Sequence, residues 1–104
     1  MKIIIKVVDK IGEELCDAKN YIKLAEREKT EHPSLSETFA ALAKEEMGHV
    51  KMLHEEVENL ISQVKERDGE LPAEMMAVYD YEHKKQIDKA NKIKRMIDDY
   101  REER

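Results

Sequence analysis

The first break in the helical pattern of this sequence is Lys29-Thr30-Glu31-His32-Pro33-Ser34. Pro33 has no backbone N–H, and its ring clashes with the preceding turn, so a helix cannot run through it. A second break, Asp68-Gly69-Glu70-Leu71-Pro72, pairs a glycine suited to a helix C-cap with a proline suited to a first helical position. We therefore predict three helices, over about residues 3–29, 35–67 and 72–102. Ser34-Leu35-Ser36-Glu37 resembles a capping box, which predicts that these serines cap the second helix.

Each predicted helix carries an apolar stripe at steps of three and four residues, a spacing that places the stripe on one face. A disordered, highly charged chain would not hold three such stripes, so the pattern predicts an all-α fold. The stripe residues are Ile4, Val8, Ile11, Leu15, Ala18, Ile22 and Ala25 in the first helix; Phe39, Leu42, Leu53, Leu60 and Val64, flanked by Ala43, Met47, Val50, Val57 and Ile61, in the second; and Met76, Tyr79, Ala90, Ile93, Ile97 and Tyr100 in the third.

Length and composition exclude several classes of protein. The 104 residues suffice for a single domain over residues 1–104, with 41% charged residues and a net charge of −5. No apolar run approaches the ~18 residues of a membrane span, and the opening Met1–Val8 is too short and too charged for a signal peptide. One cysteine, Cys16, allows no internal disulfide. We expect a cytoplasmic protein that is not bound to membranes.

The short breaks predict that neighbouring helices are antiparallel, with the first two forming a long hairpin. Three thin stripes on helices of roughly 40–50 Å leave apolar edges uncovered. We therefore expect a homodimer or a higher homo-oligomer, because self-association would cover those edges.

Polar residues interrupt the stripe of the second helix at Glu46 and His49. In the first helix, Glu14 lies beside the main stripe, on a line with Val7 and Tyr21. A buried carboxylate without a partner is costly, and a bound metal ion would resolve that cost. Carboxylates and imidazole are ligands that suit iron, manganese or zinc. If the first turn is centred near residue 32, Glu14 lies level with Glu46 and His49 to within a turn, so the three side chains should converge.

These residues resemble a known family. Glu14 with Tyr21 seven positions on, followed by Glu46-Met47-Gly48-His49, is similar to the first half of a rubrerythrin-like or ferritin-like di-iron carboxylate protein. In that superfamily one helix provides a Glu and the next a Glu-x-x-His. The resemblance covers about residues 7–60 and implies a di-iron cofactor and ferroxidase-like or rubrerythrin-like oxidation chemistry, with Glu14, Glu46 and His49 as metal ligands and no other catalytic residue.

The sequence departs from the family in having one ligand set where a complete four-helix bundle has two. It also lacks the cysteine pair of a rubredoxin-like module. Two copies of the chain would supply four carboxylates and two imidazoles, the ligand complement of a di-iron centre. The chain thus looks like a half-bundle completed by oligomerisation, as in encapsulated ferritin-like proteins, with iron the expected metal and manganese or zinc the alternatives.

The third helix offers Asp80-Tyr81-Glu82-His83 as a further set of ligands. With the second turn centred near residue 70, His83 lies opposite residue 57, about 12 Å along the axis from His49. A straight third helix therefore misses the first site, and His83 could instead pair with His54. We keep Asp80, His54 and His83 as secondary metal-ligand candidates.

A non-catalytic role is the main alternative, in which the chain is a structural or interaction protein with a buried Glu/His pair. Nucleic-acid binding is disfavoured, because acidic residues intersperse the lysines of the third helix and no aromatic residues interleave them.

Overall fold

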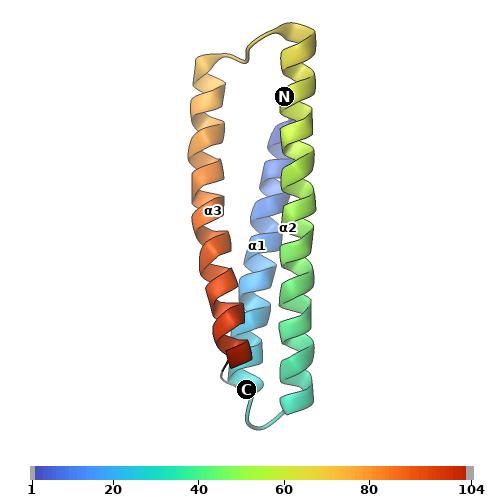
Figure 1. Cartoon of the computed structure of the whole chain (residues 1–104), viewed down its shortest axis with the longest axis vertical. Coiled ribbons are helices and arrows are strands. Elements are labelled where there is room, and N and C mark those ends of the chain that lie inside the picture. Colours follow the sequence, from blue (N-terminus) through green and yellow to red (C-terminus); the bar gives the residue numbers. More distant parts are fainter. Residues whose placement is uncertain (1, 103–104) are drawn as a thin grey trace.

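The computed structural model describes residues 2–102, which form three α-helices and no strand (Figure 1). The helices are α1 (Lys2–Glu28), α2 (Pro33–Asp68) and α3 (Ala73–Glu102). The predicted all-α class is confirmed for this part of the chain. Gly69, with φ of 82°, ends α2 in a conformation that favours glycine, and its N–H donates to the Lys65 carbonyl at 2.9 Å.

The start of α2 differs from the prediction. Pro33 occupies the first turn, where its missing N–H costs nothing, and the preceding residue, His32, makes no side-chain cap. Ser34 and Ser36 consequently lie inside the helix, and the predicted capping box is wrong. The Ser36 hydroxyl is instead buried, donating to the Ala25 carbonyl at 2.6 Å and bonding the Tyr100 hydroxyl at 2.8 Å.

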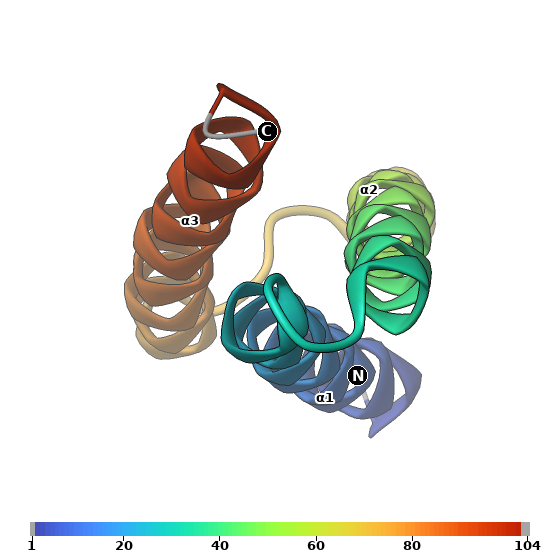
Figure 2. The ribbon, with the colours of Figure 1, turned by 90° about the horizontal axis from the view of Figure 1, so that it is seen from below.

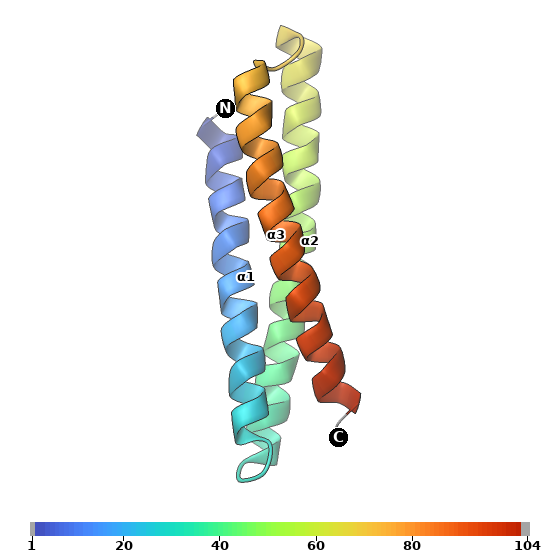
Figure 3. The ribbon, with the colours of Figure 1, turned by 90° about the vertical axis from the view of Figure 1, so that its left-hand side faces the viewer.

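The three helices lie side by side in a molecule of 56 × 18 × 17 Å (Figure 1). α1 and α2 are antiparallel and pack closely along their length, whereas α3 packs mainly on α1 and touches α2 sparsely. Seen along the bundle, α1 stands at the corner between α2 and α3 (Figure 2). α3 crosses the bundle obliquely in the side view (Figure 3).

The core follows the predicted stripe of α1 closely. Six of its seven residues are buried, and the seventh, Val8, is half-buried. Of the five buried residues of α2, Ala43, Val57 and Ile61 belong to the line predicted as flanking, whereas Ser36 and Ala40 belong to neither predicted line. The line predicted as the main stripe is half-buried at the edge of the helix pair; its members are Phe39, Leu42, Leu53, Leu60 and Val64.

Candidate metal centre

Glu14 leaves α1 on the side that faces α2. The Glu14 Oε2 atom lies 3.5 Å from His49 Nδ1. The other carboxylate oxygen, Oε1, forms an ion pair with Lys10 Nζ at 3.6 Å. Further along the same line of α1, the Tyr21 ring stacks on Phe39 of α2 at 6.2 Å between centroids. The Glu14 side chain is 12% exposed, so the α1–α2 contact removes most of it from water.

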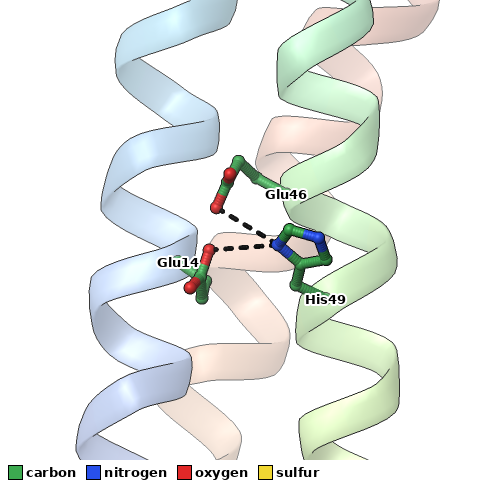
Figure 4. Close-up of side chains that lie close together, drawn as sticks. All are labelled: Glu14, Glu46 and His49. Carbon is green, nitrogen blue, oxygen red and sulfur yellow. Dashed lines mark ion pairs between the residues drawn. The ribbon is translucent and has the colours of Figure 1, made fainter.

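Glu46 and His49 project from neighbouring turns of α2, because residues three apart in a helix lie on one face. His49 Nδ1 is 3.7 Å from Glu46 Oε2 and 3.5 Å from Glu14 Oε2, so the imidazole nitrogen faces both carboxylates (Figure 4). The Glu46 side chain is 16% exposed, whereas that of His49 is 53% exposed. The group is therefore covered on the carboxylate side and open on the imidazole side.

One carboxylate oxygen of this group lacks a hydrogen-bond donor in the described part of the chain. Glu46 Oε2 is buried and, within residues 2–102, accepts no hydrogen bond. Leaving a buried acceptor unsatisfied typically costs about 1–3 kcal/mol, and more for a charged group. Native structures rarely retain such an atom without an explanation, and a bound ion is one of the usual ones.

The donor set fits a transition-metal ion. One ligand atom from each of Glu14, Glu46 and His49 can be chosen so that all three lie within 4.8 Å of one another. Metal bonds to these ligands are about 2.0–2.2 Å, so ligand atoms around one ion lie up to roughly 4.4 Å apart, and small adjustments would close the group on an ion. Within residues 2–102, no other set of three His, Cys, Asp or Glu side chains converges as closely.

This group lies on the face of the α1–α2 pair that is turned away from α3. On α1, Gly12 faces α3, because a Cβ added at Gly12 would lie 3.8 Å from Gln86 Nε2. Glu14 lies about 200° around the helix axis from Gly12. On α2, His54 contacts α3, and His49 lies about 140° around the axis from His54. In Figure 4, α3 accordingly passes behind the helix pair. We call this side, with Phe39, Leu42 and Leu53 beside the group, the outer face.

The secondary candidates lie elsewhere. The rings of His54 and His83 stack at 4.5 Å between α2 and α3, so the predicted contact of these two residues is present, and His54 Nε2 is 2.8 Å from Glu58 Oε1. Asp80 is exposed on α3 and belongs to no convergent ligand group among the residues that the structure describes. Neither histidine joins the Glu14 group, which agrees with the predicted level of His83.

Two contacts of these groups escaped the sequence prediction, although the spacing could have revealed both. Lys10 lies one turn before Glu14, and Glu58 lies one turn after His54, and pairs four residues apart on a helix are neighbours. Tyr79, which stacks on His83 at 5.5 Å, was expected only as a core residue.

No family model, no curated protein and no solved structure matches this chain. None of the helices in residues 2–102 has both the length and the low charge of a membrane span.

Proposed function

We propose that Glu14, Glu46 and His49 bind a transition-metal ion, with iron as the native metal. The observation that carries this proposal is the buried Glu46 Oε2, which accepts no hydrogen bond yet lies beside two further potential ligands. A cation placed there would meet the unsatisfied oxygen and neutralise two carboxylates that the protein holds in a mostly buried position. Manganese and zinc take the same ligands and are the alternative occupants.

The same group is an incomplete site in one chain. Three ligands leave coordination positions open, and the exposed side of His49 and the half-buried apolar residues of the outer face lie where a second copy could pack. A two-fold dimer through this face would bring two copies of each ligand together, giving four carboxylates and two imidazoles. This is the composition of a di-iron centre, and α3 would stay outside the interface.

Iron bound there would supply one-electron redox chemistry, namely oxidation of Fe(II) by dioxygen or peroxide. The protein's own contribution is binding and charge compensation. Glu14 and Glu46 hold the cation from two helices, while the α1–α2 contact limits water on the carboxylate side. The chain is then a ferritin-like half-bundle that works as a homodimer.

Metal binding by the purified protein tests the proposal. After removal of metal with a chelator, anaerobic titration with Fe(II) should give about two ions per dimer, measured by calorimetry and by elemental mass spectrometry. Glu46→Ala and His49→Ala should each weaken binding at least 100-fold, because loss of an outer partner of a ligand already costs about 10–100-fold. Glu45→Ala removes a neighbouring exposed carboxylate and should leave binding unchanged.

Sedimentation velocity with and without Fe(II) tests the dimer, since the proposal links metal binding to association. Absence of bound metal in the wild-type protein after iron loading would refute the metal site. The remaining function would then be the structural alternative, a helical bundle in which His49 pairs with two acids.

A further inference from the structure

The two ends of α3 are attached differently. Its C-terminal end is anchored in the core, where Ile93, Ile97 and Tyr100 are buried. The Tyr100 hydroxyl bonds Ser36 at 2.8 Å, and the same serine bonds the Ala25 carbonyl, so one network joins all three helices. No residue in the N-terminal half of α3, residues 73–87, is fully buried.

The N-terminal half of α3 meets α2 through histidine rings. His83 stacks on His54 with centroids 4.5 Å apart and planes inclined by 6°, and on Tyr79 at 5.5 Å and 8°. A cavity of about 330 Å³ adjoins the stack between α2 and α3, with room for water. Its lining consists of His54, Glu58, Ile61, Ser62, Met76, Tyr79 and His83.

Protonation of this stack would place two cations face to face. The titratable groups around His83 are His54 and Glu58 from α2 and Tyr79 and Asp80 from α3; α1 provides no lining residue of the cavity. Burial, and secondarily the charge of His54, lower the pKa of His83, and the acids Glu58 and Asp80 only partly offset this. A proton consequently binds more readily to His83 when α3 is detached than when it is packed.

We propose that the His54–His83 stack is a pH-sensitive latch that releases the N-terminal half of α3 from α2 under mildly acidic conditions. While His83 is neutral, its ring stacks on that of His54 without repulsion between like charges. As the pH falls, the detached state takes up a proton on His83 first, and repulsion between His83 and a charged His54 ring favours that state. The buried network of Ser36 and Tyr100 consists of two hydroxyls and a backbone carbonyl and includes no histidine, so the C-terminal end stays in place and acts as the pivot.

Release would uncover apolar surface of α1. A groove of about 550 Å³ runs between the N-terminal halves of α1 and α3, with Ile4, Val8 and Leu15 on one side and Val78 on the other. Gln86 Nε2 donates to the Val8 carbonyl at 2.9 Å across the groove. This hydrogen bond joins two uncharged groups of α3 and α1. It does not offset the repulsion between charged histidine rings of α2 and α3.

Distance measurement between two spin labels tests the latch in the full chain. One label is placed on the native Cys16, which is exposed on α1, and the other on Ala77→Cys, an exposed position of α3. At pH 7.5 a single narrow distance distribution is expected. At pH 5.0 the ratio of detached to packed molecules should rise at least about fivefold, the factor that corresponds to the roughly 1 kcal/mol repulsion of two unit charges 4 Å apart in water.

Matched variants show whether the response to pH comes from the His54–His83 stack or from protonation elsewhere in the protein. His83→Phe keeps an aromatic ring that cannot be charged and should abolish the response to pH, and His54→Phe should do the same from the α2 side. His32→Gln removes an exposed histidine of the first turn and should leave the response intact. Circular dichroism checks that each variant is helical. An unchanged wild-type distance at pH 5.0, or equal responses of wild type and either Phe variant, would overturn the proposal. A chelator in every sample keeps the outcome independent of metal binding.

Discussion

At the scale of single residues, the buried position of Glu46 does not contribute to the stability of the fold. Its Oε2 is buried and receives no hydrogen bond from residues 2–102. Sites that bind ligands commonly hold groups in arrangements that reduce the stability of the free protein. The position of Glu46 is therefore understandable if a cation meets the carboxylate in the working protein.

This view predicts opposite effects of Glu46→Gln on stability and on metal affinity. The substitution keeps the shape and removes the charge, so the metal-free protein should gain roughly 1 kcal/mol in free energy of unfolding. Urea denaturation in the presence of a chelator measures this change. The same variant should bind Fe(II) at least 100-fold more weakly. A loss of stability in the metal-free variant would show that Glu46 is held by partners within the protein, and Glu45→Gln is the surface control.

At the scale of helices, α1 contacts both other helices, whereas α2 and α3 contact each other sparsely. Ser36 and Tyr100 are the point where all three helices are joined, close to the first turn. Lys29 adds a cation–π contact, with its Nζ 5.5 Å from the centre of the Tyr100 ring. The packing of α3 should therefore be most sensitive to changes at this end.

Ser36→Ala should lower the free energy of unfolding by about 1–3 kcal/mol, because it leaves a buried hydroxyl and a buried carbonyl without their partner. Tyr100→Phe should cost less, since Ser36 keeps its bond to the Ala25 carbonyl. In urea denaturation the double variant should lose less than the sum of the two single losses, which is the signature of direct coupling. Ser34→Ala, at an exposed position of the same helix, should change stability by less than about 0.5 kcal/mol. Equal effects of Ser34→Ala and Ser36→Ala would contradict the role of the buried network.

At the scale of the whole molecule, the chain leaves a good deal of apolar surface in contact with water. Several large apolar side chains are exposed by more than 40%: Ile3, Ile5, Leu35, Met52, Val78, Tyr81 and Ile87. The outer face adds half-buried leucines on both sides of Glu46 and His49. A rod 56 Å long and about 18 Å wide encloses little volume for its surface, so association through a flat helical face is the expected way to bury more.

Leu42→Glu should prevent metal-dependent dimer formation, because it places a charge in the apolar part of the outer face. Lys51→Glu places the same charge at an exposed position about 180° around α2 from Leu42, off that face, and should leave the dimer intact. Sedimentation velocity with Fe(II) distinguishes the two variants. Dimers of Leu42→Glu with wild-type stability would show that the copies associate through another surface.

The positions of the helices and the height of the candidate site were readable from local patterns. Pro33 and Gly69 end or begin helices through their own backbone restrictions, and the three-and-four spacing marks one face of each helix. An antiparallel hairpin with a short turn then places Glu14 beside His49, because both lie at nearly equal distances from the turn. Local chemistry was sufficient for these features, since each depends on residues close in sequence or on counting from a turn.

The tertiary structure decided how each helix is rotated and where α3 lies. Whether Val57 or Leu53 faces the core of α2, and whether Ser36 caps a helix or bonds Tyr100, depends on side chains from distant segments that fill the same space. Packing between distant segments also sets the position of α3 on α1. That position leaves the outer face open beside Glu46 and stacks His83 on His54. The sequence by itself determined which residues could meet; packing between remote helices determined which of them do, because the fit of two surfaces cannot be read from the periodicity of either one.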